Sequence, residues 1–267
     1  MRPPPCKRKK VRRSVKRKHS GPLQEITVVS VNARGIKSKL TSLKRIITEL
    51  NPEIVALQET KLKEKEKITV AGYEWIDGNR KNQSGGGGVG FLVHTSILKN
   101  TIREPSSLIP DKTELRWIRL TLSCNAQICF GVFYGKQETD AADITQDDYI
   151  TLQDQISSYL SQNYHIILLG DFNAKIGADD IGIPGGDPTI TRNGIMLRNL
   201  IQNTGLVILN STPICEGLFT RINTQNPDER SIIDFALASP SMVPSVSKMV
   251  IDEHEDYLQT AQCQNQN

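Results

Sequence analysis

The chain has 267 residues, which is enough to bury one substantial core, and its composition excludes a membrane-spanning or disulfide-stabilised protein. No apolar run approaches the roughly 20 residues that a membrane helix needs. The five cysteines are scattered and form no CxxC pair, so we expect reduced thiols, no zinc knuckle, an intracellular location and no membrane partner.

The net charge of +4 conceals a basic N-terminal segment and an acidic remainder. Residues 1–20 contain ten Lys and Arg, and the rest of the chain carries 23 basic and 29 acidic residues, a formal charge of −6. Residues 1–22 should therefore be a disordered tail that binds nucleic acid or directs nuclear import, or else a solvated extension without a partner. The predicted nucleic-acid contacts of this tail are Lys7, Arg8, Lys9, Lys10, Arg12, Arg13, Lys16, Arg17 and Lys18.

The first half of the folded region alternates predicted strands with one helix. The β-branched run ITVVSV ends at Asn32, which places an amide at the end of a strand. Apolar residues at helical spacing then run from residue 40 to residue 50, and the buried strand EIVALQET that follows ends near Glu59. The glycine run at 85–88 precedes another strand and lacks the GxxxxGK[ST] pattern, so it indicates a flexible hairpin connection and no phosphate-binding loop.

The second half delivers further polar groups to strand ends. Residues 116–122 and 127–135 should form paired strands, the second of which delivers Tyr134 at its end. A helix then leads to the aliphatic strand HIILLGD. Asp171 and Asn173 follow that strand two residues apart and should point to the same side, where they could hold a metal, a phosphate or a water. A turn that merely caps the strand is the alternative for GDFN alone.

Asp234 lies within SIIDFALAS, in the middle of the last predicted strand, after a helix at 193–205 and the strands LVILN and LFTRI. A carboxylate flanked by apolar residues must be paired or hydrogen-bonded, so Asp234 is a candidate for a functional site. Strands alternate with helices in places and run as consecutive hairpins elsewhere, which favours an α/β fold of two packed sheets covered by helices.

The motifs VNARG, LQETK, VFYGK, GDFNA and SIIDFALAS occur in this order between residues 26 and 257. The series closely resembles that of the endonuclease/exonuclease/phosphatase superfamily, which includes apurinic endonucleases, pancreatic deoxyribonuclease and inositol-phosphate phosphatases. It is most similar to the endonuclease domain of LINE-type retrotransposons. This resemblance implies a deoxyribonuclease-like four-layer α-β-β-α sandwich of two mixed sheets, formed by residues 23–257 and acting on DNA as a monomer.

The resemblance also implies a role for each residue at the strand ends. Glu59 would be the main carboxylate ligand of Mg²⁺ or Mn²⁺, with Asn32 assisting, and no further cofactor is implied. Asp171 would orient or deprotonate the attacking water, and Asn173 would stabilise the transition state. Tyr134 would contact the scissile phosphate and Thr220 the substrate, although ordinary strand placement is the alternative for these two residues. Carboxylate and amide ligands suit these ions, and the absence of a His/Cys cluster argues against zinc.

The sequence departs from the family pattern at its C-terminal end. In the family, the aspartate at position 234 orients a histidine from a Ser-Asp-His segment, which is missing here, and His254 is a poor substitute between two glutamates. Residues 258–267 are polar and lack strand periodicity, so we expect a truncated domain without its last strand, with an exposed sheet edge. Loss of a general acid or base costs roughly 10²- to 10⁴-fold in rate, so cleavage should be impaired.

Three functions therefore remain open. The first is a metal-dependent nicking endonuclease of a retrotransposon, present here as an impaired copy. The second is a host apurinic or general nuclease of the same superfamily. The third is a catalytically inactive protein that binds nucleic acid through its basic tail. A small-molecule phosphatase fits the basic tail least well.

Overall fold

The computed structural model describes residues 25–63, 65–78, 87–105, 109, 113–122, 125–137, 145–180, 182–223, 225–253 and 258–264, the last of these ranges by its backbone alone. The basic tail and His254 lie outside these residues. No helix in the described ranges is long and apolar enough to span a membrane.

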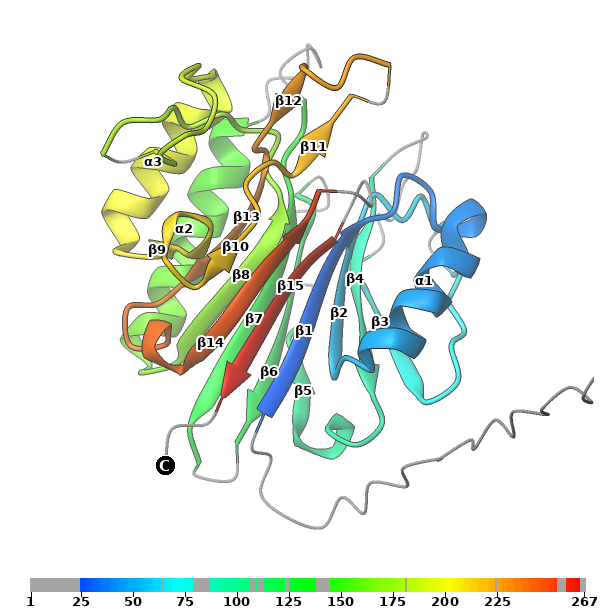
Figure 1. The fold of residues 1–267 in the computed structure, drawn as a ribbon. Coiled ribbons are helices and arrows are strands. Elements are labelled where there is room, and N and C mark those ends of the chain that lie inside the picture. Colours follow the sequence, from blue (N-terminus) through cyan, green and yellow to red (C-terminus); the bar gives the residue numbers. More distant parts are fainter. Residues whose placement is uncertain are drawn as a thin grey trace, which may run out of the picture.

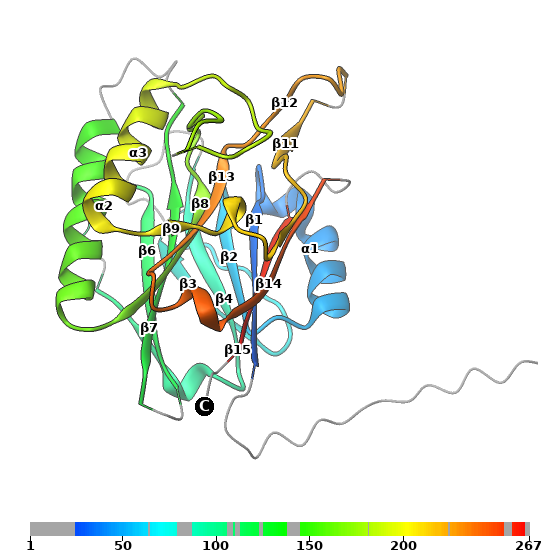
Figure 2. The same cartoon turned by 60° about the vertical axis from the view of Figure 1, so that its left-hand side comes forward.

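The structure is a sandwich of two mixed β-sheets between two helical layers, as the resemblance implies (Figure 1). A seven-stranded sheet has the order β10-β14-β15-β1-β2-β4-β3, and a six-stranded sheet has the order β5-β6-β7-β8-β13-β9. Helix α1 covers the first sheet, and α2 and α3 cover the second, on the opposite side of the molecule (Figure 2).

The elements of the first sheet and its helix are β1 (Glu25–Asn32), α1 (Ile36–Leu50), β2 (Ile54–Gln58), β3 (Tyr73–Gly78), β4 (Val89–His94), β10 (Cys215–Glu216), β14 (Val246–Asp252) and β15 (Leu258–Gln264). Those of the second sheet and its helices are β5 (Thr101–Arg103), β6 (Leu115–Thr121), β7 (Gln127–Tyr134), α2 (Thr145–Ser161), β8 (His165–Asp171), α3 (Arg192–Thr204), β9 (Val207–Ile208) and β13 (Asp234–Ala238). A separate hairpin joins β11 (Arg221–Ile222) to β12 (Arg230–Ser231).

The apolar core forms three layers because the strands present side chains to both faces of their sheets. The central layer lies between the sheets and includes Phe91 and Phe130. A second layer, with Trp117 and Phe235, lies under α2 and α3, and a third, with Leu57, lies under α1. This burial on both faces explains the near-continuous aliphatic runs of β2 and β8.

The structure corrects the expectation that the last strand is missing. Residues 258–264 form β15, which lies between β1 and β14 and pairs with both in antiparallel register. The polar residues of this segment hide the alternation on which strand prediction depends, whereas backbone pairing to two neighbours does not require an apolar pattern. β1 therefore has a neighbour on each side, β15 and β2, and no exposed edge is left there.

Two further predictions of strands were too long. LVILN forms only the two-residue strand β9 followed by a short 3-10 helix, and within LFTRI only β11 is extended. Asp234 is the first residue of β13 and does not lie in the middle of a strand. The hairpin predicted around the glycine run is consistent with the antiparallel pairing of β3 and β4, although residues 79–86 lie outside the described ranges.

Candidate active site

Two parallel strand pairs, one in each sheet, end at the same edge of the sandwich. Asn32 ends β1, and its Nδ2 donates hydrogen bonds to Glu59 Oε1 at 2.9 Å and to Asp171 Oδ2 at 2.7 Å. Glu59 follows β2 in the first sheet, whereas Asp171 ends β8 in the second. One carboxamide therefore joins carboxylates from both sheets, and the sequence motifs 139 residues apart meet at this point.

Glu59 is held by the backbone around it. It adopts a left-handed conformation with φ 47°, and its carbonyl oxygen accepts a hydrogen bond from Gly35 N at 2.8 Å. Its side chain is 16% exposed, and Oε2 lies 3.8 Å from Lys61 Nζ. The carboxylate is thus accessible from solvent and also bonded to Asn32, which is suitable for a metal ligand.

Asp171 and Asn173 form a turn at the end of β8. Asn173 N donates to Asp171 Oδ1 at 2.9 Å, and Asn173 has the positive φ of 45° that such turns tolerate. The Asn173 side chain points across to the end of β7, where its Nδ2 donates to Gly135 O at 2.6 Å. Asp171 is only 3% exposed, and hydrogen bonds from Asn32 and Asn173 hold its carboxylate in place.

Tyr134 is the last residue of β7 and lies opposite Asp171 in the parallel register. Burial, followed by the charges of Glu59 and Asp171, raises the pKa of the Tyr134 hydroxyl above its usual range. The hydroxyl therefore stays protonated at neutral pH and can act as a hydrogen-bond donor.

Asp234 lies on the other side of Asp171, paired with it in the antiparallel register of β13 and β8. Burial and the charge of Asp171 raise the pKa of Asp234, against the effect of a hydrogen bond from Thr220. Thr220 Oγ1 also accepts from the backbone N–H groups of Ile233 and Asp234, at 3.0 and 3.1 Å. The structure therefore places Thr220 as a support of the strand that carries Asp234.

The carboxylates of the site repel one another. Burial raises the pKa of Asp171 to about 7, and the charge of Glu59 adds to this effect, while hydrogen bonds from Asn173 and Asn32 oppose it. Such a concentration of negative charge favours a bound cation. No group of three or more His, Cys, Asp and Glu able to hold a metal occurs in the described residues. One or two carboxylates with an amide oxygen nevertheless suit Mg²⁺ or Mn²⁺, which keep several waters, so the donor set fits.

The two histidines within the described ranges lie away from the site. His94 Nδ1 hydrogen-bonds to Ser96, and His165, the first residue of β8, hydrogen-bonds to Ser241 at the opposite end of the strand from Asp171. Neither reaches Asp234. Whether His254 does so is outside the described residues, as are the contacts of the basic tail.

Sequence inspection missed several residues around the site. The positive charge of Arg34 lowers the pKa of both Asp171 and Asp234. Sequence inspection assigned Arg34 no role, although the residue lies within the motif VNARG. Lys136 forms a partly buried ion pair with Asp148 at 3.3 Å, and Asn193 bonds to the loops after β7 and β8. The position of Arg34 two residues after Asn32 could have indicated its role. Asn193 lies at the start of a predicted helix, where nothing in the sequence distinguishes it from an ordinary helix residue.

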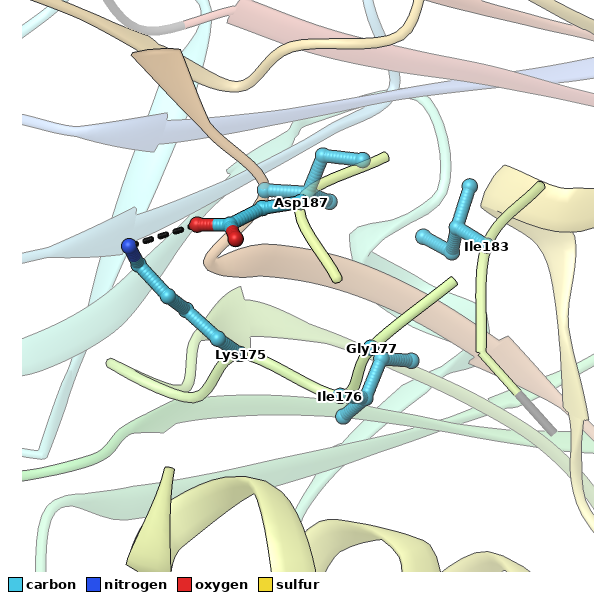
Figure 3. Close-up of a pocket in the computed structure, with 6 residues that line it drawn as sticks. Lys175, Ile176, Gly177, Ile183 and Asp187 are labelled. Atoms are coloured by element: carbon cyan, nitrogen blue, oxygen red, sulfur yellow. Dashed lines mark hydrogen bonds and ion pairs between the residues drawn. The ribbon is translucent and has the colours of Figure 1, made fainter. Parts of the chain in front are cut away.

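A small pocket beyond Asn173 is lined by Lys175, Ile176, Gly177, Ile183, Asp187 and Ile232 (Figure 3). Lys175 Nζ and Asp187 Oδ2 form an ion pair of 2.6 Å. Most of the lining is aliphatic, and its two charged groups bond to each other. The pocket therefore adds structure to the loop after Asn173 without adding a reactive group to the site.

The chain is similar to known proteins in its family and in its fold. Residues 29–259 match the model of the Endonuclease/Exonuclease/phosphatase family. No curated protein sequence matches the chain significantly.

Three solved structures illustrate the similarity of the fold. The AP endonuclease LMAP from Leishmania major has a TM-score of 0.71 and 15% identity over 91% of this chain and 89% of its own. The endonuclease domain of TRAS1, a telomere-specific non-LTR retrotransposon, has a TM-score of 0.68 and 17% identity, and the match covers 91% of this chain and 100% of that domain. A variant of the 3' phosphatase NExo from Neisseria, bound to a product DNA hairpin, has a TM-score of 0.66 and 18% identity, and the match covers 90% of this chain and 100% of the NExo chain.

Proposed function

The chain belongs to the endonuclease/exonuclease/phosphatase family, and we propose that it hydrolyses phosphodiester bonds of DNA at the site built around Asn32. The observation that carries this proposal is the pair of hydrogen bonds from Asn32 to Glu59 and Asp171. These bonds bring a solvent-accessible carboxylate and a buried one together at the edge of the sandwich. Hydrolysis of a phosphodiester needs a carboxylate that binds a cation and a base that accepts a proton from the attacking water. The solvent-accessible carboxylate suits the first role, and the buried carboxylate suits the second.

Glu59 and the carboxamide oxygen of Asn32 are the residues that would hold Mg²⁺ or Mn²⁺. When bound, the ion would neutralise charge on the phosphoryl oxygens and the leaving alkoxide. Arg34 N donates to Asn32 Oδ1 at 3.1 Å and fixes the carboxamide, so that its nitrogen faces both carboxylates.

Asp171 would accept the proton of the attacking water. Its pKa of about 7 is near the value that favours a general base at neutral pH. The Asn173 side chain also hydrogen-bonds to Tyr134, whose protonated hydroxyl bonds to Glu59. A bound phosphate would replace these partners, so that both groups donate to an oxygen that gains charge in the transition state.

Basic side chains next to the site support a polyanionic substrate. Arg34, Lys61 and Lys63 are exposed on the loops that follow β1 and β2. Lys61 Nζ lies 3.8 Å from Glu59 Oε2, and the charge of Arg34 acts on Asp171. Phosphate contacts from such residues supply most of the sequence-independent affinity for DNA. The similarity to NExo bound to a DNA hairpin agrees with DNA as the substrate class.

Within this reaction we favour the nicking endonuclease of a retrotransposon, which would leave a 3′-hydroxyl for reverse transcription. The motif order supports this proposal, as does the similarity to the TRAS1 domain over the whole of that chain. A repair nuclease is the second candidate because LMAP, an AP endonuclease, is comparably similar in fold. Cleavage of abasic duplex far above that of intact plasmid would favour the second candidate.

A third candidate is a protein that binds DNA without cleaving it. The observation in its favour is that neither His94 nor His165 lies at Asp234, where the family would use a histidine. Binding to DNA in EDTA, without cleavage in Mg²⁺, would favour this candidate.

Plasmid nicking by the full chain tests the proposal. We expect conversion of supercoiled to open-circular plasmid in Mg²⁺ or Mn²⁺, at a rate reduced by EDTA and by Asp171→Ala. Ser239→Ala is a suitable control, because Ser239 supports the far end of β8. Cleavage that is insensitive to both EDTA and Asp171→Ala would contradict the site assignment.

A further inference from the structure

The first turn of helix α3 is attached to the loop that carries Asn173. Thr191 caps the helix, and its Oγ1 accepts from Gly194 N at 3.2 Å. The same residue bonds to Lys175 twice, since Thr191 N donates to Lys175 O at 3.0 Å and Thr191 Oγ1 accepts from Lys175 N at 3.1 Å. A Cβ at Gly194 would lie 1.8 Å from Lys175 O, so the backbones approach as closely as glycine permits. The helix start and the loop therefore form one rigid unit.

Asn193 extends this unit to the loop after β7. Its side chain is fully buried, with 0% exposure, and its Nδ2 donates to Lys136 O at 2.8 Å and to Asn173 O at 3.1 Å. A carboxamide nitrogen carries two N–H groups, so both are used, one for each loop. One buried side chain of α3 thus ties together two of the loops around the site, those after β7 and β8.

The left-handed conformation of Asn173 is one that asparagine tolerates, and the surroundings hold the residue in a single orientation. Asn193 holds the carbonyl of Asn173, while the Asn173 side chain donates to Gly135 O at 2.6 Å. Gly135 directly follows Tyr134. The two carboxamides thus fix Asn173 and Tyr134 relative to each other.

We propose that Asn193 is a positioning residue for the hydrolytic site and acts through Asn173 and the loop after Tyr134. The expected effect on cleavage rests on the proposed function. The expected effect on the structure of the loops rests only on the hydrogen bonds of Asn193. Asn193 touches no reacting group and sets the direction in which the second N–H of the Asn173 carboxamide points.

Asn193→Asp is the sharpest test because it keeps the shape of the side chain and removes both donors. The new carboxyl oxygen would face the carbonyl oxygens of Lys136 and Asn173, and the loops should separate. Misplacement of about 1 Å can cost roughly 10²-fold in rate, so we expect kcat for plasmid nicking to fall about 10- to 100-fold with KM changed less than about threefold. Asn193→Ala should act in the same direction and serves if the aspartate variant does not fold.

Ser239→Ala is the matched control for a general loss of stability. Ser239 is also buried and its Oγ accepts from Ile166 N at 3.1 Å, but it lies at the opposite end of β8 from Asp171. It should lower the melting temperature and leave kcat within about twofold. An equal loss of kcat in Ser239→Ala and Asn193→Asp would contradict positioning.

Coupling to Asn173 provides the second kinetic measurement. In an Asn173→Ala background there is no carboxamide left to orient, so Asn193→Asp should cost less than about threefold there. An equal cost in both backgrounds would overturn the inference.

Amide hydrogen exchange tests the same inference without activity. Asn193→Asp should accelerate exchange at Asn173 N, which donates to Asp171 Oδ1, and at Gly135 N, which donates to Asp171 O, but not at Ala33 N in the other sheet. Unchanged exchange at Asn173 and Gly135 would contradict the inference even if nicking fell. A wild-type chain that does not nick would contradict the proposed function, and exchange would then decide the role of Asn193 alone.

Discussion

The two βαβ units of the molecule, β1-α1-β2 and β7-α2-β8, deliver polar side chains to the same edge by different means. In the first unit, three backbone hydrogen bonds join residues 33–36 to residues 58–60. In the second, one backbone bond from Gly135 N to Asp171 O is supplemented by the side chains of Asn173 and Asn193.

In the β1-α1-β2 unit, the side chains proposed to function are therefore not the groups that hold the loops together. In the β7-α2-β8 unit, the same side chains serve both purposes. Because backbone bonds do not depend on the side chain, Glu59 can be replaced while its loop is kept. Asn173, in contrast, is both a proposed donor to the phosphate and a bridge to Gly135. The second unit should therefore be the more sensitive to substitution.

The largest expected effect distinguishes the two units directly. Glu59→Gln and Asn173→Ala should each lower the nicking rate by roughly 10²- to 10⁴-fold. Glu59→Gln should leave the metal-free protein as stable as the wild type or more so, because it removes a charge that repels Asp171. Asn173→Ala should destabilise it by about 1–2 kcal/mol, because the bond to Gly135 O is lost. Nicking rates and urea denaturation in EDTA provide the measurements.

A fall in stability for Glu59→Gln equal to that for Asn173→Ala would show that both units depend on side chains. Arg45→Gln is a suitable control for the removal of a charge, because Arg45 pairs with Glu49 on the exposed surface of α1, away from the site. It should change neither nicking nor stability appreciably.

The glycines of the two units should differ in the same sense. A Cβ at Gly135 would lie 2.3 Å from Phe172 O, so Gly135→Ala must push the loops apart and should cost about 3 kcal/mol or more. At Gly35 the nearest atom to a Cβ is the flexible Lys61 Cδ at 3.6 Å, and the positive φ of 101° alone should cost about 1–2 kcal/mol. Chemical denaturation of both variants measures the difference. Equal costs would mean that the loop after β7 can shift freely.

The sequence predicted the parts of this arrangement that depend on strong local patterns. The aliphatic runs before Asn32, Glu59, Tyr134 and Asp171 all form strands, and each of these residues lies at the edge where the parallel pairs end. Buried parallel strands give such runs, and the carboxyl ends of parallel strands meet at one edge of a sheet. The resemblance to the family then identified the two-sheet sandwich.

The remainder depends on tertiary contacts that leave no local signal. The strand β15 consists largely of polar residues and is recognised only through its pairing with β1 and β14. Asn193 appears in the sequence as an ordinary residue at the start of a helix, and its contacts lie 20 and 57 residues away. Asp234 seemed to be in the middle of a strand because the apolar residues before it continue the pattern, although they precede β13.

The pH dependence of stability should also differ between the units. Asp171 has a pKa of about 7 in the folded protein, above its ordinary value, so keeping it ionised costs stability at pH 8. This cost is relieved as the pH falls through about 7 and is absent below about pH 4. Asp171 should therefore contribute about 2 kcal/mol to a gain in the stability of the metal-free protein between pH 8 and pH 5. Asp171→Asn should reduce the gain by about this amount and leave the share of Asp234, whose pKa is also raised. Urea denaturation in EDTA at several pH values measures this, and an unchanged slope in Asp171→Asn would contradict the assignment.

The smallest expected effect concerns the ion pair that closes the loop after Asn173. Burial tends to raise the pKa of Asp187, but hydrogen bonds from Lys175 and Thr189 and the charge of Lys175 outweigh it and lower the pKa to about 2. A lowered pKa stabilises the fold above the ordinary value near 4 and ceases to do so as the pH falls toward 2. Asp187→Asn should thus cost about 1 kcal/mol at pH 7, after allowance for solvent screening, and much less at pH 2, where half of the carboxyl groups are protonated. Lys175→Met should cost a similar amount, and the double variant should cost no more than either single change, because both remove the same pair. Additive costs would show that each residue acts through other contacts, and the loop after β8 would then depend on Asn193 and Thr191 without help from the ion pair.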